Sequence, residues 1–128
     1  MLKAKKGRLL ISEPSLTDKI FFKSVILLTH HNKVESIGLI LNHATSINLN
    51  EIMTKIPIED LPLYIGGPVG KNSLQFIHTL GKKIPNAIKI FNGLYWGGDF
   101  EEVIKLMNNQ KISKNDIRFF AGYSGWEE

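Results

Sequence analysis

The sequence predicts an α+β fold with a mixed, mostly antiparallel sheet. Two observations predict it: apolar runs bounded by turn residues dominate the 128-residue chain, and only two segments repeat apolar residues at helical spacing. The expected order is three strands, a helix, three strands, a second helix and a last strand, so single helices interrupt runs of strands. With 43% hydrophobic residues, the chain fits a single domain, residues 1–128, with its own core.

Three strands are expected in the first third of the chain. The first covers residues 8–12, and the second covers residues 20–29, which are rich in β-branched and aromatic side chains. A third strand covers residues 37–41. The polar segment 31–36 joins the second strand to the third, so these two are expected to form a hairpin.

Two segments carry helix signals. The first, residues 49–56, has apolar residues at helical spacing after Asn48 or Asn50 as the N-cap. The second begins at Asp99 as the N-cap, with Glu102 three residues later as in a capping box. Its apolar stripe comprises Phe100, Val103, Ile104 and Met107. The remaining strands are expected at residues 63–65, 74–80, 87–95 and 117–123.

The segment IGGPVGKNS, residues 65–73, only partly matches a phosphate-binding loop, which needs Gly, four free positions and then Gly-Lys-Ser or Gly-Lys-Thr. Ile65 stands at the first glycine position, Asn72 replaces the hydroxyl that would contact magnesium, and Pro68 removes one backbone N–H. We therefore expect residues 66–68 to connect two strands tightly, with an anion-binding nest as the alternative.

Composition excludes several classes of site. The chain has no cysteine, which excludes disulfides, thiol catalysis and cysteine-ligated metal centres and fits a reducing compartment. No apolar run is long enough to span a membrane, and Ser12, Glu13 and Pro14 interrupt the apolar run that follows the basic start. We expect a cytoplasmic protein with no signal peptide and no membrane segment.

The net charge of +4 makes nucleic acid an alternative partner. Residues 1–35 hold seven Lys or Arg and three Asp or Glu, whereas residues 36–128 hold nine of each kind. Fourteen of the 16 basic residues are lysine, which lacks the bidentate fork of arginine, and the segment after the second helix is strand-like rather than a recognition helix. The residues of this alternative DNA-binding segment are Lys3, Lys5, Lys6, Arg8, Lys19 and Lys23.

Motifs for catalysis are incomplete. Ser124 lies in GYSGW, which lacks the Gly-x-Ser-x-Gly spacing of a nucleophile elbow. The four histidines are His30, His31, His43 and His78, and no two have the helical spacing of a zinc site. His30, His43 and His78 meeting from adjacent strands would form a hydrolase or metal centre, which is a second alternative. We expect no catalytic residue, no resident metal and no cofactor.

Several segments, in this order, resemble the YqgE/AlgH family of small bacterial proteins. They are GRLLISEPSLTDKIFFKSVILLTHH from Gly7, IGLILNHA from Ile37, YIGGPV from Tyr64, FIHTL from Phe76 and FFAGYSGW from Phe119. The resemblance implies an α+β fold in which a bifurcated mixed sheet curls into a pseudo-barrel with two or more helices packed outside. It also implies a regulatory role, since family members are commonly described as transcriptional regulators, and it supplies no catalytic residues.

One departure from the family concerns the C-terminus. Family members continue beyond Gly-Trp with a helix and further residues, whereas this chain ends at Glu128. We therefore expect it to lack the usual C-terminal extension. A last strand without that cover would favour self-association.

Function is expected to lie in binding an unidentified protein or small molecule. The unusual residues are at turns and strand ends, where rigid scaffolds present functional groups. The expected binding surface comprises Asn42, Gly66, Gly67, Pro68, His78 and Tyr123.

Overall fold

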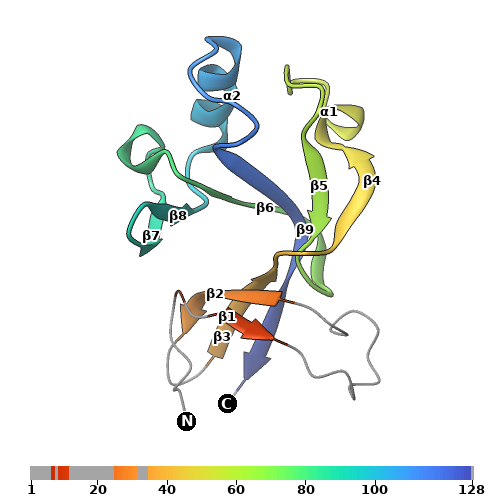
Figure 1. The fold of residues 1–128 in the computed structure, drawn as a ribbon, viewed down its shortest axis with the longest axis vertical. Helices are drawn as coiled ribbons and strands as arrows, with labels where there is room; N and C mark the ends of the chain where they lie inside the picture. Colours follow the sequence, from red (N-terminus) through yellow and green to blue (C-terminus); the bar gives the residue numbers. More distant parts are fainter. Residues whose placement is uncertain (1–6, 8, 12–24, 32–34, 128) are drawn as a thin grey trace.

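The computed structural model describes residue 7 and residues 9–11, 25–31 and 35–127. In this part of the chain, nine strands belong to one sheet, and two α-helices accompany them (Figure 1). The strands are β1 (Leu9–Ile11), β2 (Val25–His31), β3 (Glu35–Ile40), β4 (Ala44–Asn48), β5 (Pro62–Ile65), β6 (Val69–His78), β7 (Ile88–Phe91), β8 (Leu94–Trp96) and β9 (Ile117–Glu127). The helices are α1 (Leu49–Ile52) and α2 (Phe100–Asn108), with a 3-10 turn, η1 (Gly81–Lys83).

Strand β9 is the centre of the sheet. Its first half lies between β5, which is parallel to it, and β6, which is antiparallel. Its second half pairs with β3, which continues through β2 to β1. Figure 1 shows the two groups of strands at opposite ends of β9, with both helices beside its first half. The bifurcated, mostly antiparallel sheet is thus confirmed, as is the antiparallel pairing of β2 with β3.

The two edges of the sheet approach each other, so the barrel nearly closes. Gly7, which precedes β1, donates its N–H to the carbonyl oxygen of Leu28 at 2.8 Å. A Cβ atom built on Gly7 would lie 3.2 Å from Cδ1 of Phe91 on β7, the opposite edge strand. The pseudo-barrel with helices outside is therefore confirmed.

Two apolar clusters occupy the two faces of β9. Ile117 and Phe119 belong to the helix-side cluster, which also contains Val103 of α2. Phe120 belongs to the barrel-side cluster with Leu27. Successive side chains of a strand point to opposite faces, and both phenylalanines are 0% exposed, so β9 is buried on both sides. None of the helices in the described residues is long and apolar enough to cross a membrane.

Several elements differ from the sequence-based expectation. Strand β4 was not expected, because its side chains are mostly exposed at the edge of the sheet and carry no apolar signal. Helix α1 ends at Ile52, with Met53 already extended at φ −134°. The expected strand 87–95 is a hairpin of β7 and β8, turned at Gly93 with φ +81°. That turn contains Asn-Gly, a common hairpin signal.

Candidate functional site

The loop from Gly66 to Pro68, here called the joint, connects β5 to β6 at the place where both strands lie beside β9. Gly66 donates its N–H to Ala121 at 2.9 Å, and its carbonyl oxygen accepts the N–H of Ile40 at 2.9 Å and the Ser124 hydroxyl at 3.1 Å. Gly66 and Gly67 are buried. The loop thus connects two strands tightly, and the backbone polar groups of Gly66 are used within the sheet.

Glycine is required at this joint by close backbone approach. A Cβ atom on Gly66 would lie 2.4 Å from the carbonyl oxygen of Gly122, a contact that real Cβ atoms do not make. Gly122 itself has φ +72°, a conformation that disfavours other residues. The glycine pattern that marks this segment in the sequence therefore has a structural cause.

Most of the expected binding surface does lie near this joint. Tyr123 pairs in register with Val69, immediately after Pro68. Asn42 follows Ile40 by two residues and is exposed, and its Oδ1 atom accepts the N–H of Val25 at 2.8 Å. The side chain of Asn42 thus ties the end of β3 to the start of β2.

His78 lies apart from these residues, at the other end of β6. Val69 pairs with Tyr123 and His78 with Ile117, six residues apart along β9, which corresponds to roughly 20 Å of strand. His78 is only 1% exposed. The structure therefore does not bring His78 into one surface with Gly66, Gly67 and Pro68.

Both ring nitrogens of His78 are used within the protein. Nε2 donates to the carbonyl oxygen of Gly97 at 2.9 Å, and Nδ1 accepts the N–H of Leu80 at 3.2 Å. This arrangement needs the neutral ring with its proton on Nε2. Burial lowers the pKa of His78, and the hydrogen bond to Gly97 opposes this only partly. The ring can bind neither a proton nor a metal without losing a hydrogen bond.

The residues of the two alternative sites, the histidine centre and the DNA-binding segment, either lie apart from one another or fall outside the described residues. Among the residues that the structure describes, no group of three His, Cys, Asp or Glu side chains could hold a metal ion. His30, His43 and His78 therefore do not converge: His30 pairs with Ile37 in the barrel strands, and His78 lies beside Ile117 at the far end of β9. The DNA-binding alternative, Lys3, Lys5, Lys6, Arg8, Lys19 and Lys23, lies outside the described residues.

A groove of about 660 Å³ opens where α1 and α2 face β6 and β9. Leu63 and Phe76, each 6% exposed, line its buried part, whereas Ile52 is 57% exposed at its mouth. The other residues that line it are Met53, Lys71, Asn72, Ser73, Leu74, Gly98, Phe100 and Ala121. Most of its wall is therefore apolar.

A bulge in β6 supplies the polar rim of this groove. Val69 pairs with Tyr123 and Leu74 with Ala121, so in the described chain residues 70–73 have no register partner on β9 and form a bulge. The Ser73 hydroxyl donates to the carbonyl oxygen of Gly70 at 2.6 Å, which stabilises the bulge. In the described part of the chain, Lys71 has no ion pair.

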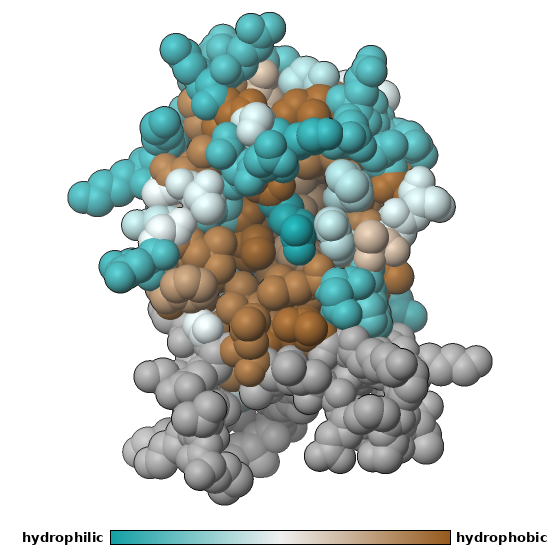
Figure 2. Space-filling model, in the orientation of Figure 1, coloured by the Kyte–Doolittle hydropathy of each residue, from teal (hydrophilic) through white to brown (hydrophobic). Residues whose placement is uncertain are grey.

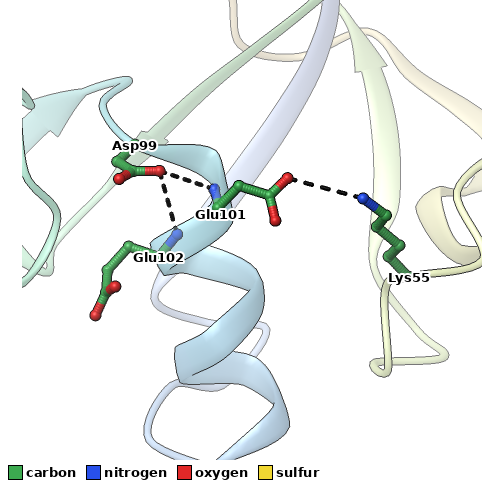
Figure 3. A network of polar contacts seen from close by, with 4 residues as sticks. All are labelled: Lys55, Asp99, Glu101 and Glu102. Carbon is green, nitrogen blue, oxygen red and sulfur yellow. Dashed lines mark hydrogen bonds and ion pairs between the residues drawn. The ribbon is translucent and has the colours of Figure 1, made fainter.

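An exposed ion pair connects the segments on either side of the groove (Figure 3). Lys55, just after α1, reaches Glu101 in the first turn of α2, with 3.8 Å between Nζ and Oε1. Asp99 caps α2 by accepting the N–H groups of Glu101 and Glu102 at 3.0 and 3.4 Å, as the sequence predicted. Exposed pairs contribute only about 0 to 1 kcal/mol, so this ion pair adds little to the stability of the fold.

The side chains of the groove suit binding better than acid–base chemistry. Among the described residues that line it there is no histidine, cysteine or carboxylate, and the Ser73 proton is already donated to a backbone carbonyl. The volume lies within the usual range of about 300 to 1,000 Å³ for small-molecule sites. Sequence reasoning missed this groove because its walls come from elements between residues 52 and 121, and no local motif marks them.

Comparison with protein families and curated proteins gives a consistent result. The family model described as AlgH-like matches residues 9–128. UPF0301 proteins of Bacteroides fragilis and Bacteroides thetaiotaomicron are 46% and 47% identical over 123 and 124 residues. Each comparison covers 95% of this chain and 62% of the relative, so the chain spans about three fifths of the length of these relatives.

Two solved structures share the fold. A protein from Corynebacterium diphtheriae matches with a TM-score of 0.75 and 23% identity, over 98% of this chain and 68% of that one. The solution structure of the AlgH protein from Pseudomonas aeruginosa matches with a TM-score of 0.72 and 23% identity, over 99% and 72% of the two chains. At this identity the likeness shows the fold.

Proposed function

The chain belongs to the AlgH-like family, and we propose that it is a non-enzymatic cytoplasmic protein of regulatory type that binds a small amphipathic molecule. The observation that carries the proposal is the apolar groove between α1 and α2, with a rim formed by the bulge of β6. The regulatory part rests on the family resemblance and the cytoplasmic part on the cysteine-free composition.

The apolar part of the ligand is expected to lie against the buried wall of the groove. Leu63, Phe76 and Leu74 present aliphatic and aromatic surface there, and Phe100 of α2 and Met53 beside α1 flank it. Covering this surface gains roughly 25 cal/mol per Å² of apolar area removed from water. This gain favours an aliphatic or aromatic body over a sugar or a nucleotide base.

The polar head of the ligand is expected at the bulge, and its charge is expected to be negative. Lys71 presents an ammonium group without an ion pair in the described residues, and Asn72 also lines the groove. A carboxylate, sulfonate or phosphate would accept hydrogen bonds from both side chains. The proposed ligand is therefore an anionic amphiphile.

A titration with 1-anilinonaphthalene-8-sulfonate tests the proposal, because this dye combines an apolar body with one anionic group. The groove variant is Ile52→Glu, which places a negative charge at the exposed mouth, and the matched control is Leu9→Glu on β1, where the side chain is 58% exposed. Wild type and control are expected to bind the dye equally. The groove variant is expected to bind about tenfold more weakly, a difference of about 1.4 kcal/mol.

Equal affinity of Ile52→Glu and wild type would refute the groove as the binding site. Amide chemical shifts recorded in the same titration add a second readout. Shifts should concentrate at residues 71–74 and at Phe100, and shifts confined to other parts of the sheet would count against the proposal. Dodecanoate serves as a second probe, because it carries an aliphatic body with a carboxylate head.

Direct DNA binding is a second proposal, which rests on the charge excess in residues 1–35. It predicts that binding of a fluorescent duplex weakens steeply as salt concentration rises. Neutralising Lys3, Lys5 and Lys6 with glutamine should reduce that salt dependence. An absence of any binding at low salt would end this proposal without affecting the groove.

A further inference from the structure

Arg118 lies on the face of β9 opposite the helix-side cluster, and two contacts orient its guanidinium group. Its Cζ atom lies 4.6 Å from the centroid of the Tyr64 ring. Its Nη1 atom donates to the carbonyl oxygen of Leu41 at 3.1 Å. Stacking on an aromatic ring together with a backbone hydrogen bond restricts the plane of the group. The head of this exposed side chain is therefore held in place.

The charge of Arg118 has no carboxylate partner in the described residues. Asp60 and Asp116 each line one of the hollows beside Arg118, and both are engaged elsewhere: Asp60 pairs with Lys114 at 2.7 Å, and Asp116 accepts the N–H of Ser113 at 2.8 Å. The remaining N–H groups of the guanidinium are thus free of ion pairs within the described chain. An arginine that is oriented but not neutralised is suited to bind an oxyanion through two parallel hydrogen bonds.

Two hollows meet at Arg118. One, of about 230 Å³, is lined in part by Pro62 and Tyr64, and the other, of about 260 Å³, is lined in part by Ile77 and Leu94. Both hollows include Arg118 and Asn115, whose side-chain amide supplies further donors. The cation therefore stands between two small recesses whose walls are partly apolar and partly polar, and Lys114 lines both.

Strand register extends the apolar surface away from Arg118. Arg118 lies opposite Ile77, Ile77 opposite Trp96, and Trp96 opposite Ile88, so these side chains form one row on one face of the sheet. Ile88 is 49% exposed, and Trp96 is half-buried. Figure 2 shows an apolar region over β7 and β8 that extends toward the crossing of β6 and β9.

We propose that Arg118 is the anion-binding residue of a second ligand site, which binds the carboxylate or phosphate of a small molecule whose apolar part lies against Ile77 and Leu94. Asn115 donates a further hydrogen bond to the same anion. The site lies on the opposite face of β9 from the groove, since Ile117 and Phe119 point to the helix side. It is therefore independent of the proposed function.

Amide and arginine side-chain NMR titrations with four probes test this site: inorganic phosphate, phenyl phosphate, acetate and benzoate. If the site prefers phosphate, phenyl phosphate is expected to cause saturable shifts at Asn115, Ile117 and Arg118. If it prefers carboxylate, benzoate is expected to cause them. The preferred aromatic probe should bind about tenfold more tightly than phosphate or acetate, because its ring covers apolar surface. Comparison of the phosphate pair with the carboxylate pair shows which oxyanion the site takes.

Two variants test whether the anion binds through two parallel hydrogen bonds from Arg118 or only through its positive charge. Arg118→Gln is expected to abolish the saturable shifts, and Arg118→Lys, which keeps the charge but loses the fork, should weaken binding several-fold. The matched control, Lys89→Gln, removes one exposed positive charge elsewhere and should bind as wild type does. Unchanged shifts at Val103 and Leu39, which belong to the two apolar clusters and are remote in sequence from residue 118, establish that each variant is folded. Affinity unaffected by Arg118→Gln, or equal affinity for phenyl phosphate and phosphate, would overturn the proposal.

Discussion

The ring of His78 stacks on the ring of Tyr95, with 5.9 Å between the centroids and 10° between the planes. The two residues are paired in register on β6 and β8, and the hydrogen bonds of His78 to Gly97 and Leu80 complete its surroundings. His78 is thus a buried, neutral residue that ties β6 to the turns before η1 and before α2. These contacts give His78 a packing role at this end of β6.

The first prediction is a pH-dependent stability that arises from His78. Its pKa is lowered in the folded protein, so the unfolded chain binds a proton more readily as pH falls below the ordinary value of 6.5. The free energy of unfolding should therefore be constant above that value and fall at lower pH, with a slope of at most about 1.4 kcal/mol per pH unit. Urea unfolding at pH 7.5, 6.5, 5.5 and 5.0 measures it.

Two variants test whether His78 causes this pH dependence of the free energy of unfolding. His78→Gln should lose stability at pH 7.5, because a buried hydrogen-bond pair is disturbed, but it should show a smaller decrease toward pH 5 than wild type. Tyr95→Phe, which keeps the ring stacked on His78, should keep the slope of the wild type. An identical slope in His78→Gln and wild type would show that other groups cause it.

The second prediction concerns the joint at Gly66. Gly66→Ala places a methyl group 2.4 Å from the carbonyl oxygen of Gly122, so the crossing of β5, β6 and β9 must open. We expect a loss of about 2 to 4 kcal/mol in the free energy of unfolding, measured with urea. Gly93→Ala is the control, since a Cβ there meets nothing within 4 Å; its φ of +81° alone should cost about 1 kcal/mol. Similar losses in both variants would refute the steric explanation.

The third prediction concerns the N-cap of α2. Asp99→Ala removes the acceptor of two backbone N–H groups, at 3.0 and 3.4 Å. The free energy of unfolding should fall by about 1 kcal/mol, and Asp99→Asn should retain most of it, because asparagine is also a good N-cap residue. Thermal or urea unfolding of the two variants measures the difference. Equal destabilisation by alanine and asparagine would indicate that the charge of Asp99, rather than the cap, matters.

The fourth prediction is a small coupling between Lys55 and Glu101. Their side chains are 66% and 76% exposed, so solvent screens the pair. A double-mutant cycle with alanine at both positions should give a coupling energy of about 0 to 1 kcal/mol that decreases at high salt. A coupling well above this range would mean that solvent screens the pair much less than its exposure indicates.

Local patterns in the sequence predicted much of the framework. The hairpin of β2 and β3, the Asp99 cap and the strand connection at Gly66 each depend on residues that are close in sequence, where turn and capping preferences act directly. The order of motifs also predicted the family. Elements without a local signal were missed: β4 is exposed at an edge, and α1 stops sooner than its apolar spacing indicates.

The sequence by itself determined the α+β class, the family and the places where backbone geometry demands glycine or an N-cap, because these depend on short-range sterics and hydrogen bonds. Only the tertiary structure decided which side chains meet. It placed β5 and β6 on either side of β9, set residues 71–73 beside a groove, buried His78 away from Gly66, and held Arg118 against Tyr64. These contacts join residues far apart in the chain, so their geometry follows from the packing of the whole sheet and not from any segment alone.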